Sequence, residues 1–344
     1  MKQSLFYAAG LLLLAACSQT PKQNYVVTFN ADPQLNDQTA YIVDFDTEDK
    51  IDSAVITDGI AVFQGELTAP RYVTISVDGR GAGRLILEGD SITVNTDGSV
   101  IGGELNAKNS EFMESYMATI KEFRALPDSL QEARYPEYNE RITNAENKLM
   151  EENIDNPLGY AVFLSGPGSS YTLTELDSVL AAHPSLGEYN RVQKLRQSLV
   201  NLDETSEGKM FKDFEVTYND STFRLSDYVG KGKYVLVDFW ASWCGPCIRQ
   251  TAVIKDLYKE YGPKGLEVIG VAVWDKPEDT LKGIEAHELP WMNVINAQSI
   301  PTDLYGIKGI PCIILFGPDG TILSRGKQSD ELRADVSKAM ADAK

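Results

Sequence analysis

The chain has 344 residues, 43% of them hydrophobic and 24% charged, which is enough for two or three domains with a core each. This composition is typical of globular proteins and excludes a disordered chain, a collagen and a membrane helix bundle. The net charge of −18 repels phosphate backbones, so we expect no nucleic-acid partner. The acidity lies mostly before residue 208, because residues 208–344 carry 17 basic and 19 acidic side chains.

The N-terminus predicts a cleaved signal peptide over residues 1–16. Lys2 precedes an apolar run (5–16) that is too short to span a bilayer. Small residues directly before Cys17 resemble a bacterial lipoprotein signal, which implies cleavage before Cys17 and a lipid on its sulfur. The alternative is a plain secretory signal with an incidental cysteine. We expect a lipid-anchored protein of the bacterial envelope, at the outer membrane and facing the periplasm, with residues 17–24 as a polar tether.

Two segments of different periodicity follow the tether. Residues 25–105 contain short runs with period-two alternation, separated by Asp-Gly and proline breaks, and predict a small antiparallel β-sandwich. Residues 106–207 place apolar side chains three or four apart and predict an α-helical domain. One of its helices starts near Ser170, with Thr174 as the expected cap. Neither segment shows a catalytic pattern.

Residues 208–344 carry the chemistry. The apolar run 233–241 predicts a buried strand, and a Cys-Gly-Pro-Cys motif then opens a helical pattern before a second apolar run at 265–274. In this strand–CxxC–helix–strand order, the motif indicates thiol redox chemistry. Cys244 lies at the expected helix N-terminus, where free backbone N–H groups and the helix dipole lower the pKa of a thiol. Cys247 lies one turn further on.

Other uses of the cysteine pair fit less well. A zinc site needs four ligands, and the chain offers one CxxC with two distant histidines. Haem attachment needs a histidine where Ile248 stands, and a peroxidatic cysteine needs a threonine where Ala241 stands. An inert disulfide across so short a loop would add little stability. We therefore expect no metal and no cofactor.

The stretches VLVDFWASWCGPC (235–247) and YGIKGIPCIILFGPDG (305–320) resemble the two signature stretches of thioredoxin. Together with the signal, β-domain and helical segment, the chain resembles envelope thiol-disulfide oxidoreductases of the TlpA/ResA type, in particular lipoproteins of Bacteroidetes. The resemblance implies a multidomain protein in which a β-sandwich and a helical segment precede a thioredoxin-like α/β domain at 208–344.

The resemblance also implies roles for the residues of the motif. Cys244 is the nucleophile that attacks a substrate disulfide, and Cys247 is the resolving thiol. Asp238 matches a buried carboxylate that acts as general base or proton relay for Cys247; the alternative is an aspartate exposed at a strand edge. Burial would raise the pKa of this carboxyl group. Thioredoxin has a lysine near its aspartate, but the run 266–274 contains none.

Pro311 matches the cis-proline that faces the CxxC motif in this fold, and Ile310 before it would pair with an extended substrate. Trp240 is expected in the core. The residues expected to contact substrate are Trp243, Gly245, Pro246, Ile310 and Pro311.

Two positions depart from the family pattern. ResA-like proteins place a glutamate where this chain has Gln250, which cannot transfer protons as a carboxylate does. Cys312 stands where thioredoxin has a threonine. It is either a small core residue or a third thiol close enough to trap or regulate Cys244.

The function expected from this resemblance is reduction of disulfides in cysteine-containing envelope proteins, for example in cytochrome c maturation. A membrane dithiol donor would have to recharge the pair in an oxidising envelope. The alternatives are a disulfide isomerase or oxidase of the envelope, and a non-enzymatic lipoprotein whose acidic first 200 residues bind a partner.

Overall fold

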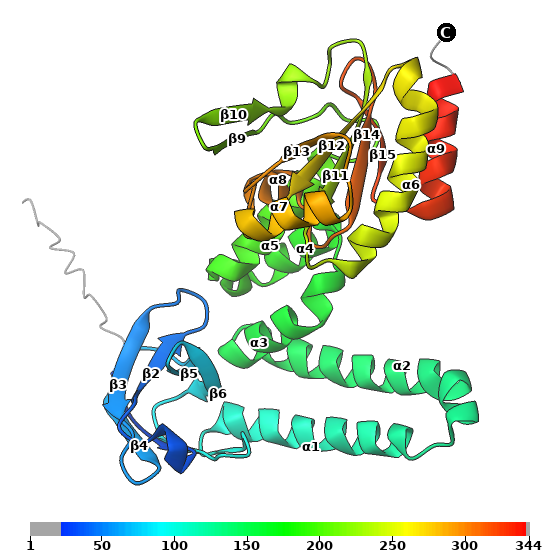
Figure 1. The fold of residues 1–344 in the computed structure, drawn as a ribbon. Coiled ribbons are helices and arrows are strands. Elements are labelled where there is room, and N and C mark those ends of the chain that lie inside the picture. The colour runs from blue at the N-terminus through cyan, green and yellow to red at the C-terminus, as the bar shows by residue number, and fades with distance from the viewer. Residues whose placement is uncertain (1–21, 342–344) are drawn as a thin grey trace, which may run out of the picture. The chain divides into compact units, whose positions relative to one another are not determined.

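The computed structural model describes residues 22–341, so the predicted signal peptide and Cys17 lie outside the described residues. The chain forms two compact units, one ending at Ser170 and the other beginning at Tyr171 (Figure 1). This boundary divides the helical segment 106–207 that the sequence predicts as one domain. Within residues 22–341, no helix combines the length and apolar character needed to cross a bilayer.

The N-terminal unit begins with a β-sandwich of two four-stranded sheets, as predicted. The first has the order β4-β1-β7-β8 and the second β3-β2-β5-β6. The strands are β1 (Gln23–Asn30), β2 (Thr39–Asp44), β3 (Lys50–Val55), β4 (Ile60–Leu67), β5 (Arg71–Val77), β6 (Arg80–Leu87), β7 (Ser91–Val94) and β8 (Val100–Ile101). Alternate residues of both sheets, among them Val27, Ile42 and Ile75, form one core. The expected antiparallel pairing is wrong at one place, because β7 pairs with β1 in parallel.

Three helices complete this unit: α1 (Glu104–Arg124), α2 (Asp128–Asn153) and α3 (Pro157–Ser165). The start of α1 is fixed to β6 by hydrogen bonds. The side chain of Asn106 donates to the backbone oxygen of Ile86 and accepts from its N–H, both at 2.8 Å. The carboxylate of Glu88 accepts from the N–H of Leu105 at 3.0 Å and so satisfies a free donor in the first turn.

The C-terminal unit consists of a five-stranded sheet, a hairpin and six helices in the described part of the chain. Its elements are α4 (Leu173–Ala182), α5 (Asn190–Glu204), β9 (Glu215–Tyr218), β10 (Ser221–Arg224), β11 (Tyr234–Trp240), α6 (Gly245–Tyr261), β12 (Leu266–Ala272), α7 (Pro277–Ala286), β13 (Met292–Val294), α8 (Ile300–Tyr305), β14 (Cys312–Phe316), β15 (Ile322–Arg325) and α9 (Ser329–Ala341). The sheet order is β13-β12-β11-β14-β15, with the first three strands parallel. This confirms the thioredoxin-like α/β fold.

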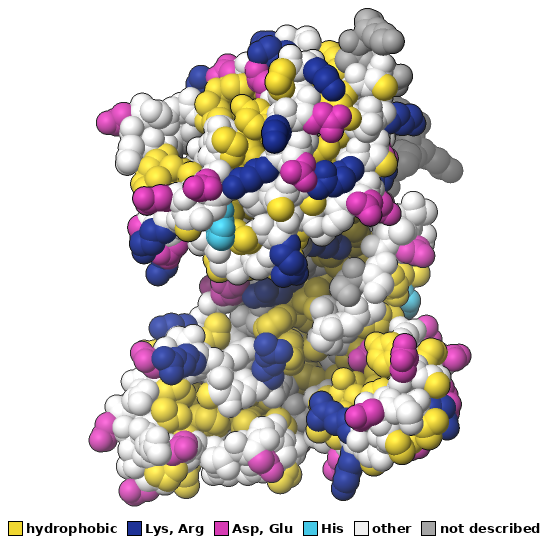
Figure 2. Space-filling view, turned by 45° about the vertical axis from the view of Figure 1, so that its right-hand side comes forward, with side chains coloured by type: hydrophobic (Ala, Val, Ile, Leu, Met, Phe, Trp, Pro, Cys, Tyr) yellow, Lys and Arg dark blue, Asp and Glu magenta, His cyan; other side chains and the backbone are white. Residues whose placement is uncertain are grey.

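The sheet is covered on both faces, which explains the continuous apolar runs in the sequence. On one face, Leu236 of β11 packs with Ile254 of α6 and Leu332 of α9. Figure 1 shows α6 and α9 side by side on this face. On the other face, Phe239 packs with Tyr305 of α8. Figure 2 shows Lys and Arg side chains interspersed with Asp and Glu over the surface of this unit, in keeping with the nearly balanced charge of residues 208–344.

Helices α4 and α5 belong to this unit because α5 is bonded to α8 and β15. The side chain of Asn201 donates to the backbone oxygen of Asp303 at 2.8 Å. The guanidinium of Arg325 donates to the backbone oxygen of Thr205, also at 2.8 Å. The cap expected at Thr174 is wrong: Thr172 caps α4, because its hydroxyl and the carboxylate of Glu175 form a reciprocal capping box.

Candidate redox site

The two cysteines of the motif form a disulfide at the start of α6. Cys244 and Cys247 are joined with their Cα atoms 5.2 Å apart, and both are buried. Cys244 is the N-cap residue, and its sulfur accepts a hydrogen bond from the N–H of Cys247 at 3.2 Å. After reduction, the same N–H and the helix dipole would stabilise a thiolate on Cys244. The expected position at a helix N-terminus is therefore confirmed.

A buried carboxylate that the sequence analysis missed holds the loop before the disulfide. Asp275, only 7% exposed, accepts from the N–H of Ser242 at 2.8 Å and from its hydroxyl at 3.1 Å. It also accepts from the hydroxyl of Thr280 at 3.0 Å. The carboxylate thus joins the CxxC loop to the start of α7. The one signal in the sequence that could have indicated Asp275 is its position directly after the second apolar run, at the end of a predicted strand.

The residues expected to contact substrate surround the disulfide. Trp243 is 61% exposed, and its indole N–H donates to the backbone oxygen of Trp274 at 3.1 Å. Gly245 and Pro246 are exposed beside it. Ile310 packs against the cluster that contains both cysteines. The surface around the buried sulfur atoms is thus apolar on two sides.

The bond between Ile310 and Pro311 is cis, as the resemblance implied. Trp240 is buried in the cluster of the two cysteines, which confirms the core position expected for it. The structure thus brings together the CxxC motif and Trp240 from one segment and Ile310 from another.

Asp238 is buried and lies on the face of the sheet that α6 covers, which rules out the alternative of an exposed strand edge. It is 3% exposed and stands between Leu236 and Trp240, whose side chains pack on that face. Within residues 22–341, its Oδ1 atom has no hydrogen-bond partner. Loss of hydration raises the pKa of this carboxyl group to about 7.

Gln250 has a structural contact that explains an amide at this position. Its side-chain oxygen accepts from the N–H of Ser329 at 2.9 Å, and its nitrogen donates to the Ser329 hydroxyl at 3.1 Å. The amide offers an acceptor to the N–H and a donor to the hydroxyl, whereas an ionised glutamate would offer acceptors only and would need the hydroxyl to donate. Gln250 therefore fixes the start of α9 to α6.

Cys312 lies on the other face of the sheet from the disulfide. It is paired with Phe239 across the strands and packs in the same cluster as that residue, whereas Cys244 and Cys247 pack with Trp240. Burial raises the pKa of its thiol to about 11, so it is neutral at pH 7. This placement favours the small core residue over the third thiol that would trap Cys244.

Comparison with known proteins agrees with this geometry. Residues 208–325 match the model of the AhpC/TSA family, and residues 25–116 match a domain of unknown function, DUF4369. The thiol-disulfide oxidoreductase ResA of Halalkalibacterium halodurans is 30% identical over 128 residues, which are 37% of this chain and 69% of that protein. ResA of Oceanobacillus iheyensis is 32% identical over 111 residues, or 32% of this chain and 57% of that protein.

Among solved structures, the thioredoxin domain of a thiol-disulfide oxidoreductase from Bacteroides vulgatus is 31% identical, with a TM-score of 0.36. The match covers 39% of this chain and 96% of that domain. A thiol:disulfide interchange protein from Bacteroides sp. is 29% identical, with a TM-score of 0.36. The match covers 40% of this chain and 92% of that protein chain.

A disulfide at the N-terminus of a helix, packed with the residue that precedes a cis-proline, in a sheet that buries a carboxyl group on the same face, defines a thioredoxin-fold protein of the thiol-disulfide class. The chain belongs to the family of ResA-type thiol-disulfide oxidoreductases, with a DUF4369 domain ahead of the thioredoxin-like fold. It spans 57% and 56% of the length of the ResA proteins of Oceanobacillus iheyensis and Geobacillus thermodenitrificans.

Proposed function

We propose that the protein reduces disulfides in other proteins by dithiol exchange. The observation that carries this proposal is the Cys244–Cys247 disulfide at a helix N-terminus, with Trp243 and Ile310 beside it. An inert structural disulfide would not need an exposed tryptophan next to it. The family relationship supports the same chemistry.

The reaction proceeds in two exchange steps. The thiolate of Cys244 attacks one sulfur of the substrate disulfide, forms a mixed disulfide and releases the first substrate thiolate. The thiolate of Cys247 then attacks the sulfur of Cys244, which closes the Cys244–Cys247 disulfide and releases the second substrate thiolate. Two electrons pass from the cysteine pair to the substrate. Both released thiolates take up protons from solvent.

Asp238 acts in the second step as the base for Cys247. Its raised pKa, about 7, lets it accept a proton near neutral pH and return it later. Gln250 cannot take this part, because its amide does not titrate and is bonded to Ser329. Removal of the proton from Cys247 therefore depends on the carboxyl group of Asp238.

An extended segment of the substrate binds beside the cis-proline. The backbone of Ile310 pairs with it, and the side chains of Trp243 and Pro246 contact the residues around its disulfide. This mode needs an extended backbone and a cysteine, and few particular side chains. It suits a reductase with several protein substrates.

The setting of the reaction follows from the predicted signal. A lipid on Cys17 would anchor the protein in the bacterial envelope, where cysteine-containing proteins, apocytochrome c among them, are the substrates. A membrane dithiol donor would then reduce the Cys244–Cys247 pair again. A disulfide isomerase or oxidase remains the alternative with the same chemistry, and a partner-binding lipoprotein without exchange is the non-enzymatic one.

Two measurements test this function. We expect the full chain to reduce insulin disulfides in the presence of dithiothreitol, and Cys244→Ser to lose this activity, with Cys312→Ala as a matched control that retains it. Full activity of Cys244→Ser would contradict the proposal.

The Gly-Pro sequence between the cysteines predicts a reduction potential near that of thioredoxin, about −270 mV. A value above about −200 mV would favour an isomerase or oxidase.

A further inference from the structure

Four buried polar atoms in the C-terminal unit lack a hydrogen-bond partner within residues 22–341. They are Oδ1 of Asp238, Nε1 of Trp240, Nε1 of Trp291 and Oδ1 of Asn293. Buried polar groups are almost always paired, with protein or with bound water, so a group of four needs an explanation. These four atoms are two donors and two acceptors, which is the complement of a water molecule.

The strand register places these residues on the same face of the sheet. Asp238 of β11 is opposite Gly270 of β12, and Gly270 is opposite Asn293 of β13. Residues opposite one another in adjacent strands point to the same face of a sheet. Trp240 and Trp291, each two residues from a member of this row, pack on the face covered by α6. We call Asp238, Gly270 and Asn293 the polar row.

Gly270 leaves the middle of the polar row without a side chain. A β-carbon added there would clash with the Asn293 side-chain oxygen and would lie 3.1 Å from Nε1 of Trp240 and 3.2 Å from Nε1 of Trp291. Three of the four unpartnered atoms therefore converge above this glycine. A site with two to four polar partners is the kind that binds internal water.

We propose that the polar row is an internal water site that carries the proton of Asp238 between the cysteine pair and the edge strand β13. Asn293 is the positioning residue: its amide nitrogen donates to the backbone oxygen of Trp291 at 2.8 Å, which turns its oxygen inward. The water site stands on the geometry alone. Its use as a proton path rests on the proposed function.

The proton balance of the path is simple. The carboxylate of Asp238 takes the thiol proton of Cys247, which leaves a thiolate and a neutral carboxyl group. The carboxyl group then gives this proton to the adjacent water, which passes a proton on toward β13, and Asp238 is again ionised. No electrons move in these steps.

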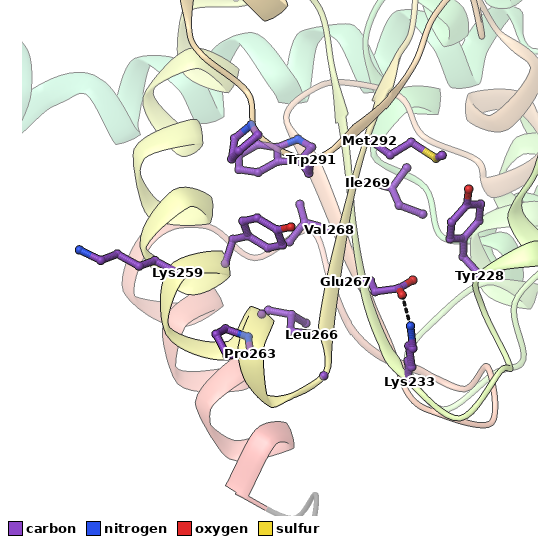
Figure 3. Close-up of a pocket in the computed structure, with 14 residues that line it drawn as sticks. Tyr228, Lys233, Lys259, Pro263, Leu266, Glu267, Val268, Ile269, Trp291 and Met292 are labelled. Atoms are coloured by element: carbon purple, nitrogen blue, oxygen red, sulfur yellow. Dashed lines mark hydrogen bonds and ion pairs between the residues drawn. The ribbon is translucent and has the colours of Figure 1, made fainter.

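The outer end of the path meets solvent at β13. Trp291 and Met292 line an open pocket of about 610 Å³, beside the part of β12 that β13 does not cover. Figure 3 shows Trp291 above Val268 in this pocket, with the ion pair between Glu267 and Lys233 further along it. Asn293 itself lines a second pocket of about 360 Å³. Trp291 and Asn293, the residues at the outer end of the path, thus each line a pocket that is open to solvent.

Three other ionisable side chains are buried on or next to the elements around Asp238. Helix α6 contributes Cys244 and Cys247 on the same face. Strand β14 contributes Cys312 on the opposite face, and the charge of Asp238 raises the pKa of that thiol. The neighbouring strands β12 and β13 place only uncharged residues in the polar row. The titration should be followed in the oxidised protein, in which Cys244 and Cys247 do not titrate.

The test replaces the positioning residue and follows the carboxyl group of Asp238 by carbon-13 NMR in the full oxidised chain. Asn293→Leu removes the inward oxygen, so water that solvates the ionised carboxylate is lost and the pKa of Asp238 should rise by about one unit or more. Met292→Leu is the matched control, because its side chain points to the other face and should leave the pKa unchanged. An unchanged pKa in Asn293→Leu would overturn the proposal.

A second measurement needs no variant. In the wild-type protein, the indole N–H protons of Trp240 and Trp291 should show magnetisation transfer from a long-lived internal water. Direct pairing of these N–H groups with protein atoms, and no such transfer, would overturn the water site. Neither readout uses catalysis, so failure of insulin reduction would remove the proposed function and leave the water site to be judged by itself.

Discussion

Asp238 couples the chemistry of the site to the stability of the fold. Folding raises the pKa of its carboxyl group from 3.8 to about 7, so between these values the native state binds more protons than the unfolded chain. The unfolding free energy is therefore highest below about pH 4, where Asp238 is neutral in both states. It falls as pH rises through about 7, because the buried group must then ionise. A shift of this size corresponds to about 4 kcal/mol.

This linkage gives a prediction for Asp238→Asn, which keeps the shape and removes the charge. The variant should be more stable than the wild type at pH 8, by up to about 4 kcal/mol, and the difference should shrink toward pH 4. Urea unfolding of the oxidised proteins across this pH range measures it. The same variant should reduce insulin more slowly at pH 7. A constant difference in stability across the range would show that the native carboxyl group is not perturbed.

At the scale of elements, the CxxC loop depends on Asp275. Asp275→Ala would leave the N–H of Ser242 and the hydroxyl of Thr280 without their acceptor. Hydrogen bonds to a charged group contribute about 1.5–3 kcal/mol each, so we expect a loss of at least about 2 kcal/mol in unfolding free energy and slower disulfide exchange. Asp279→Ala, in the first turn of α7 and bonded to exposed Lys282, is the control and should change little. Equal effects in both variants would contradict this role.

The elements around the disulfide were predictable because their signals are local. The apolar run of β11, the CxxC motif and the periodicity of α6 follow one another without a break. The bonds of Asp275 and the polar row were not predictable, because they join residues that only the strand register brings together. Gly270 carries no signal in the sequence, and its meaning depends on Asp238 and Asn293 in the adjacent strands.

At the scale of the whole molecule, the boundary at Ser170 departs from the predicted one at 207 because α5 packs on α8. Helical periodicity indicates a helix and one apolar face, but not which unit that face contacts. The partners of α5 are a backbone oxygen at Asp303 and the guanidinium of Arg325, each about 100 residues or more away in sequence. Such contacts leave no pattern in a single sequence.

This boundary predicts how fragments of the chain behave. A fragment of residues 171–341 should unfold cooperatively and retain insulin reduction, because it contains the sheet, the disulfide and α5. A fragment of residues 208–341 loses Thr205, so Nη1 of the half-buried Arg325 loses both of its acceptors, the backbone oxygen and the hydroxyl of Thr205. An unsatisfied buried group costs about 1–3 kcal/mol, so its melting temperature should be lower by several degrees. Calorimetry of both fragments measures this difference. Equal melting temperatures would contradict the assignment of α4 and α5 to the C-terminal unit and favour the separate helical domain that the sequence predicts.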